Sequence, residues 1–117
     1  MKKWIASLAI LFMSELAAAA WGAIAYDTTT GAWGLSWGWY NQQQAESTAI
    51  SYCGQPNCRV YITGQNTYLS LATSNYDKSW AGFGRATVKY ESMYWSMYYC
   101  NQGYYSCTLK ASFPTNQ

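Results

Sequence analysis

Few residues of this chain could carry out catalysis. The sequence has no histidine, which removes the most common general base and the usual serine and cysteine triads. A pair of carboxylates about 5–9.5 Å apart could still hydrolyse a glycosidic bond. Beyond residue 20, the acids are Asp27, Glu46, Asp77 and Glu91. Each has an ordinary structural role, the aspartates in turns and the glutamates near helix N-termini. The sequence therefore predicts a protein that is not an enzyme, and a small carboxylate hydrolase ranks last among the alternatives.

The four cysteines are the other residues with distinctive chemistry. They fall into two local pairs, and in an exported chain four cysteines predict two disulfides. We expect the pairs Cys53–Cys58 and Cys100–Cys107, because each closes the same place in a repeated unit; pairing between the two halves is the alternative. The spacing does not match a zinc finger, and histidine ligands are missing. We therefore expect neither a metal site nor a cofactor.

The N-terminus has the pattern of a secretory signal peptide. Lys2 and Lys3 precede an apolar run over residues 4–13, which is too short to cross a bilayer. Residues 18–20 are alanines, the small side chains that a signal peptidase requires. We expect residues 1–20 to be removed and residues 21–117 to form a single exported domain, periplasmic or extracellular, with no membrane span after cleavage. An uncleaved N-terminal anchor is the alternative.

Charge is sparse in this chain. Seven lysines and arginines stand against five acids, and aromatic residues make up 19% of the sequence. Without a basic patch we expect no nucleic-acid partner, and so many aromatic residues with so few charges argue against disorder.

The elements that must position these residues are predicted by an internal repeat. Five residues recur at a constant spacing of 47 positions, as from Trp21 to Tyr68: Trp21, Ile24, Ala25, Trp33 and Cys53 correspond to Tyr68, Leu71, Ala72, Trp80 and Cys100. We expect an α+β fold of two tandem ββαβ repeats, over about residues 21–66 and 67–117, with about six strands and two helices. The two repeats would pack as one pseudo-symmetric domain held by the disulfides.

The expected boundaries follow from side-chain alternation and helix caps. In the first repeat, strands are expected at residues 22–26, 32–39 and 58–63, with a helix at 42–53 capped by Asn41. In the second, strands are expected at residues 69–73, 79–84 and 107–113, with a helix capped by Thr87 and ending near residue 100. Residues 114–117 are expected to fray.

One predicted strand has an unusual alternation of large and small residues. Trp33, Leu35, Trp37 and Trp39 share one face, and glycine and serine occupy the other. The large face either meets the other repeat in an aromatic core or forms a partly exposed ladder. We favour the core, because a fully exposed stripe of this size would be a large adhesive patch.

Tyrosines gather near the end of the second predicted helix and in the loop after it. They are Tyr94, Tyr98, Tyr99, Tyr104 and Tyr105. Tyrosine is favoured at protein interfaces because its rigid ring is both apolar and polar. We expect a binding surface here first, and we add Trp37 and Trp39 as further candidate binding residues.

The sequence resembles a bacterial exported family known as domain of unknown function 4189. The residues that carry the resemblance are Trp21, Gly22, Ala23, Ile24, Ala25, Gly31, Ala32, Trp33, Gly34, Ser36, Gly38, Ala45, Ala49, Cys53, Cys58, Val60, Leu71, Ala72, Trp80, Gly82, Gly84 and Cys100. The resemblance implies export, disulfides and the repeat, and it transfers no catalytic residue.

These observations favour an exported, non-catalytic binding protein with a protein partner, such as an inhibitor or immunity factor of the cell envelope. The alternative is a module that binds peptidoglycan or another glycan through tryptophan and tyrosine rings.

Overall fold

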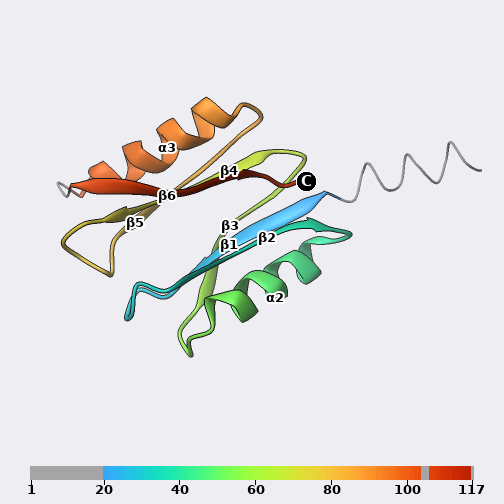
Figure 1. Cartoon of the computed structure of the whole chain (residues 1–117), viewed down its shortest axis with the longest axis horizontal. Coiled ribbons are helices and arrows are strands. Elements are labelled where there is room, and N and C mark those ends of the chain that lie inside the picture. The colour runs from blue at the N-terminus through green and yellow to red at the C-terminus, as the bar shows by residue number, and fades with distance from the viewer. Residues whose placement is uncertain (1–19, 104–105, 117) are drawn as a thin grey trace, which may run out of the picture.

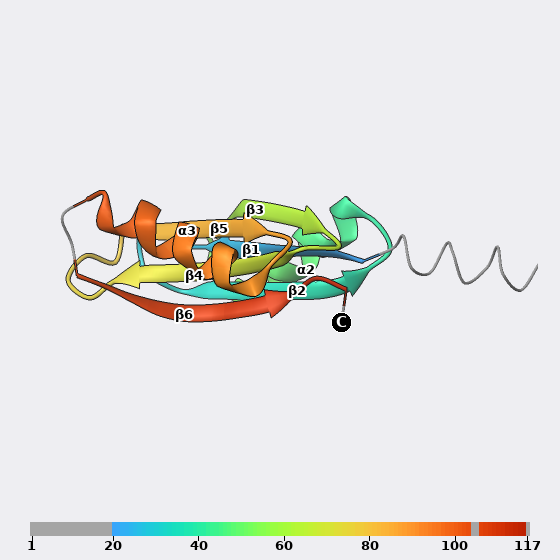
Figure 2. The same cartoon turned by 90° about the horizontal axis from the view of Figure 1, so that it is seen from above.

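The chain folds into four layers, with one helix on each outer side and two sheets between them (Figures 1 and 2). The computed structural model describes residues 20–103 and 106–116. The predicted signal peptide lies outside the described residues except for Ala20, whose carbonyl accepts a hydrogen bond from the Asn66 amide at 3.0 Å. In the described ranges, no helix is both long enough and apolar enough to cross a membrane.

The two halves have the same order of elements, which confirms the predicted fold class. The first half contains β1 (Trp21–Tyr26), β2 (Trp33–Trp39), α2 (Gln42–Cys53) and β3 (Arg59–Gln65). The second half contains β4 (Tyr68–Ser74), β5 (Ala81–Ala86), α3 (Lys89–Asn101) and β6 (Cys107–Pro114). Each half forms one antiparallel three-stranded sheet, in the orders β2-β1-β3 and β5-β4-β6.

Local signals account for the limits of α2. The Asn41 side chain accepts a hydrogen bond from the Gln44 amide at 2.8 Å, as predicted, and satisfies one of the free amides of the first turn. Gly54 ends the helix with a left-handed φ of 71°, and its amide donates to the Ile50 carbonyl. The predicted Thr87 cap of α3 is wrong: Val88 holds the N-cap position and makes no side-chain capping bond.

The two halves differ by single residues in their strands. Leu35 lies opposite Ile24, and Phe83 lies opposite Leu71. Leu35 therefore corresponds in structure to Phe83, although the spacing of 47 pairs it with Gly82. The last pair of the first hairpin is Tyr26 with Trp33, and the last pair of the second is Thr73 with Ala81, so the second hairpin has one more residue between its paired ends. Trp80 lies outside β5. Trp80 is therefore not the structural equivalent of Trp33, although the constant spacing pairs them.

A bulge in β2 restores the common register. Trp39 lies opposite Trp21 and Ser36 lies opposite Ala23, so β2 carries one extra residue between these pairs. Gly38 lies within this bulge and has a φ of 76°, a conformation that favours glycine. The bulge turns Trp39 onto the face that carries α2, where it packs on the cluster of small residues described below.

The core has an apolar centre between the sheets. Its buried members are Ile24, Tyr26, Leu69, Leu71 and Phe113. Each helix packs on its own sheet through small residues: Ala23, Ala25, Ala45, Ala49 and Cys53 in the first half, and Ser70, Ser92, Ser96 and Cys100 in the second. In the second half, a hydroxyl network replaces the alanines, because Ser70 bonds both Ser92 and Ser112.

The C-terminal segment is held in place, so the predicted fraying is wrong for Thr115. This residue is fully buried, its amide donates to the Thr67 carbonyl at 2.8 Å, and its hydroxyl accepts from the Thr67 amide at 3.0 Å. Its carbonyl accepts from the Gly38 amide at 2.8 Å and so ties the second half to the end of β2.

Candidate binding surfaces

Both predicted disulfides are confirmed. Cys53 bonds Cys58 and Cys100 bonds Cys107, with S–S distances of 2.04 and 2.07 Å. Cys53 and Cys100 lie in the last turns of α2 and α3, Cys58 directly precedes β3, and Cys107 begins β6. All four sulfurs are therefore committed to structure, and none is a free thiol that could attack a substrate or ligate a metal.

The two candidate aspartates lie in the turns before β2 and β5, and the charges of both help to raise the pKa of Tyr26, after burial of its ring. Asp27 is buried in the β1–β2 turn, where its Oδ1 accepts bonds from the Thr29 and Thr30 amides. Its Oδ2 has no hydrogen-bond partner among the described residues. Asp77 is half-buried, and the hydroxyl and amide of Ser79 donate to its carboxylate and lower its pKa. A lowered pKa is the opposite of what a general acid requires.

The two glutamates also lie apart from one another. Glu46 accepts hydrogen bonds from the Gln42 side-chain amide at 2.9 Å and the Thr63 hydroxyl at 2.8 Å. It lines a shallow pocket along β3, and the other three acids are not among the residues that line this pocket. Glu91 lies in the first turn of α3, as expected from the helix dipole.

The outer side of α3 carries a cluster of aromatic rings. Its exposed members are Tyr90, Tyr94, Trp95, Tyr98 and Tyr99, called here the α3 aromatic face. Stacked pairs run along it, with centroids 6.0 Å apart for Tyr94 and Tyr98 and 5.7 Å apart for Trp95 and Tyr99. Tyr94, Trp95, Tyr98 and Tyr99 are between 38% and 51% exposed, so much of each ring is open to solvent.

This face results from an inversion of the usual helix pattern. The residues of α3 that face the sheet are Ser92, Ser96 and Cys100, all fully buried. Beneath them, β5 presents glycines: a Cβ on Gly82 would meet the Ser96 carbonyl, and a Cβ on Gly84 the Ser92 carbonyl. Because the helix backbone lies this close to the sheet, only small side chains fit between them. The large aromatic residues are therefore on the solvent side.

The α3 aromatic face contains three of the residues predicted to bind. Tyr94, Tyr98 and Tyr99 lie together on it, and their role in binding stays a prediction. Tyr104 and Tyr105 lie outside the described residues. Trp95 was missed, although its spacing of three and four from Tyr98 and Tyr99 puts it on the same helix face and could have identified it.

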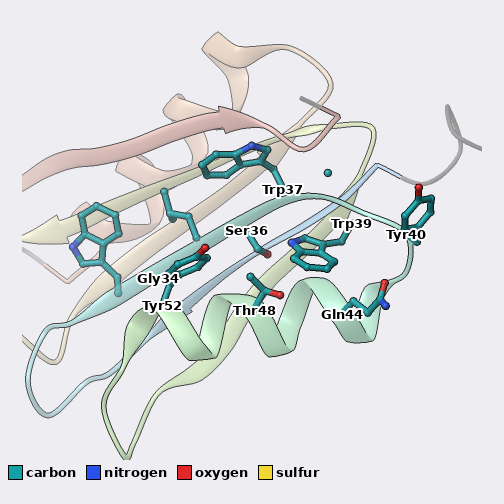
Figure 3. A pocket seen from close by; sticks show the side chains of 11 residues that line it. Gly34, Ser36, Trp37, Trp39, Tyr40, Gln44, Thr48 and Tyr52 are labelled. Atoms are coloured by element: carbon teal, nitrogen blue, oxygen red, sulfur yellow. The ribbon is translucent and has the colours of Figure 1, made fainter.

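A second surface is an open groove of about 800 Å³ between β2 and α2 (Figure 3). The groove, called here the β2–α2 groove, is lined by Trp33, Gly34, Leu35, Ser36, Trp37, Gly38, Trp39, Tyr40, Gln44, Thr48 and Tyr52. It contains the two predicted tryptophans. Trp39 and Thr48 lie between the strand and the helix, whereas Trp37 lies on the side of β6 and packs on Phe113 with centroids 5.7 Å apart.

The predicted tryptophan stripe is split by the β2 bulge. Leu35 packs in the core between the sheets, as the favoured alternative expected. Trp33 and Trp37 are 36% and 47% exposed, and Trp39 is turned to the opposite face, so the predicted aromatic core is wrong for the three tryptophans. Gln44, Thr48 and Tyr52 of the groove were not predicted, although their spacing of four residues places them on one face of α2.

The β2–α2 groove is uncharged. None of the residues that line it is acidic or basic. It offers aromatic rings, one side-chain amide, hydroxyl groups and the edge of a strand, which suit a neutral occupant rather than an ionic one.

Fold and surfaces together define a disulfide-bonded α+β protein of two similar ββαβ units that exposes two aromatic surfaces. The chain belongs to the family described as Domain of unknown function (DUF4189), whose pattern matches residues 21–113. The resemblance stated from the sequence is thereby confirmed. This match covers both halves and both surfaces.

Similar curated proteins come from mycobacteria. Protein Rv1269c of Mycobacterium tuberculosis and protein Mb1300c of Mycobacterium bovis are each 46% identical to this chain over 44 residues. The matched segment is 38% of this chain and 35% of either relative, so the similarity covers about a third of the curated proteins. No solved structure matches the chain.

Proposed function

We propose that this protein is an exported, non-catalytic binding protein whose partner is another protein, in the manner of an inhibitor or immunity factor of the cell envelope. The observation that carries the proposal is the α3 aromatic face. It supplies rigid rings that are already ordered by contact with one another, so binding would restrict few further rotations.

The composition of this face supports a protein partner. Tyrosine and tryptophan are enriched among the residues that dominate binding energy at protein interfaces. Only Lys89 and Glu91 are charged in α3, and they carry opposite signs at one end of the helix. A contiguous aromatic surface with so little charge is costly to expose to water, and it is typical of a surface that becomes covered.

Other features support export and the lack of catalysis. Two disulfides in a chain of this size are typical of oxidising compartments, and they agree with the signal-peptide pattern of residues 1–20. Asp27 and Asp77 stabilise turns, Glu46 bonds the Thr63 hydroxyl of β3, and Glu91 lies in the first turn of α3. These roles favour a binding scaffold over a hydrolase.

The test is saturable binding to a protein of the cell envelope. The protein, with both disulfides formed, is immobilised and titrated with envelope extract, and the retained partner is then purified and its affinity measured. We expect the double substitution Tyr94→Ser/Tyr98→Ser to weaken binding at least tenfold, about what the loss of interface aromatics causes. Tyr76→Ser is the matched control, because Tyr76 is 82% exposed and lies outside α3.

Two results would contradict the proposal. One is the absence of any saturable protein partner, and the other is a partner whose affinity is the same for the wild type and the double variant. Sedimentation with purified peptidoglycan, lost in the double variant but kept in Tyr76→Ser, would replace the protein partner by a glycan.

A further inference from the structure

The edge strand β2 lacks the charged residues and the proline that the other sheet edges carry, and its bulge and its bond to Thr115 are confined to the residues after Ser36. The sheet orders make β2, β3, β5 and β6 the four edge strands of the described fold. β3 contains Arg59, β5 contains Arg85, and β6 contains Lys110 and Pro114. Charged residues and proline on an edge discourage pairing with another strand. β2 has neither, although it is seven residues long.

The main chain of β2 has groups that point out of the sheet. The Asp27 amide donates to the Ala32 carbonyl at 2.8 Å and sets the pattern of the β1–β2 ladder. Along an antiparallel ladder, hydrogen-bonded pairs alternate with pairs that are not hydrogen-bonded to each other. The main-chain groups of Gly34 therefore turn toward β1, and those of Trp33 and Leu35 turn away from it. These outward amides and carbonyls border the β2–α2 groove and are oriented to bond a further strand.

We propose that β2 pairs with β2 of a second copy of this chain, antiparallel and about a two-fold axis near Leu35, so that two sheets become one continuous sheet. This contact uses a different surface from the α3 aromatic face and goes beyond the proposed function. Charge favours a second copy as the occupant. A two-fold interface brings each residue near its own counterpart, so a charged groove would repel itself, whereas this groove is uncharged.

The position of α2 defines what meets at the axis. The Ser36 hydroxyl donates to the Ala45 carbonyl at 2.6 Å, and Gly34 lies against the Ala49 carbonyl. Leu35 is therefore level with the helix turn between these two alanines, and Thr48 lies in the groove from this turn (Figure 3). The axis places Thr48 beside its own counterpart.

The exposed area of the groove fits a weak dimer. Trp33, Trp37, Tyr40 and Tyr52 are 36%, 47%, 65% and 73% exposed. At roughly 200 Å² for a whole aromatic side chain, they expose on the order of 450 Å². A standard interface buries about 800 Å² on each partner, and the strand edge and the rest of the groove supply part of the difference. We expect a dissociation constant on the order of micromolar.

The test is the oligomeric state of the protein with both disulfides formed, measured by sedimentation velocity from about 1 to 500 µM, a range that spans the expected dissociation constant. We expect a reversible monomer–dimer equilibrium. Thr48→Arg should weaken the dimer at least tenfold, because it places two like charges and two long side chains at the axis. Ser47→Arg is the matched control. It adds the same side chain at the preceding position, which is exposed and does not line the groove. Circular dichroism and thermal unfolding verify that both variants fold.

Amide hydrogen exchange followed by NMR locates the contact. The amides of Trp33 and Leu35 should exchange more slowly as the concentration of the wild type rises, but not in Thr48→Arg. A monomer at every concentration overturns the proposal, whatever peptide or glycan the groove then binds. A dimer that survives Thr48→Arg, or one that is lost in Tyr94→Ser/Tyr98→Ser, overturns it as well.

Discussion

Adding a single methyl group at Gly34 tests how closely α2 packs on its sheet. A Cβ at this position would meet the Ala49 carbonyl and the Cys53 amide nitrogen, both of which are helix backbone atoms. Side chains can rotate away from such a contact, but a helix backbone can only move as a body. The disulfide from Cys53 to Cys58 restricts that movement further. Gly34→Ala should therefore push α2 away from β2 and open the packing of the small residues between them.

The expected loss follows from two opposing effects. An alanine within a strand is intrinsically better than glycine by about 0.5–1 kcal/mol. Overpacking a closely packed interface costs about 1–3 kcal/mol, and contacts with backbone belong at the upper end of this range. We expect Gly34→Ala to lower the free energy of unfolding by about 2 kcal/mol. For a domain of this size, that corresponds to a fall in Tm of about 8–16 °C.

Urea unfolding followed by tryptophan fluorescence and far-ultraviolet circular dichroism measures this loss. Gly82→Ala in the second half should lose a similar amount, because its Cβ would meet the Ser96 carbonyl and the Cys100 amide nitrogen. Gly31→Ala is the control: the nearest atoms to its Cβ are 3.5 Å away, and only its φ of 80° disfavours alanine, by about 1 kcal/mol. A Gly34→Ala variant as stable as the wild type would refute the close approach of helix and sheet.

Three further predictions concern the core and the disulfides. Burial raises the pKa of Tyr26 in the folded state. The free energy that its protonated hydroxyl contributes to folding is therefore complete below the pKa of an unfolded tyrosine, about 10, and is lost as the pH rises above that value. Tyr26→Phe should be less stable near pH 8 because it loses a hydrogen bond, and unfolding curves should show this gap narrowing above pH 10. Ser70→Ala removes the hydroxyl that bonds both Ser92 and Ser112. It should lower the free energy of unfolding, measured in urea, by about 2 kcal/mol. Adding Ser92→Ala should cost less than the sum of the single changes, and additive losses would argue against the network. Replacing Cys100 and Cys107 together by alanine should lower the free energy of unfolding by about 2.5 kcal/mol, judged from the loop length, and an unchanged midpoint in urea would contradict this.

Local patterns were sufficient to predict most of the fold. Asn41 marked the start of α2, and the helix spans the expected residues. The order of elements and the disulfides followed from the repeat and from the local cysteine pairs. Thr87 misled the prediction of the second cap, because α3 begins one residue later than a Thr87 cap would place it. Val88 therefore occupies the cap position.

The one-residue differences between the halves were not visible in the spacing. The second hairpin has one extra residue between its paired ends, and the first half has one extra residue in the β2 bulge. The two insertions compensate for each other, so residues before the hairpin turn and after the bulge keep the spacing of 47. Trp33 and Trp80 therefore match in sequence and differ in structure. The register of a strand is set by its pairing partners, and a slip of one residue moves every side chain to the other face.

The sequence by itself determined the class of protein, the helix and strand order, the disulfide pairs and the abundance of aromatic residues, because these depend on local propensity and on composition. Only the tertiary structure decided which aromatic residues are exposed. The serine stripe and the strand glycines bring α3 so close to its sheet that its rings point to solvent, and the β2 bulge separates Trp37 from Trp39. Both outcomes depend on contacts between segments that are distant in sequence, which no local pattern encodes.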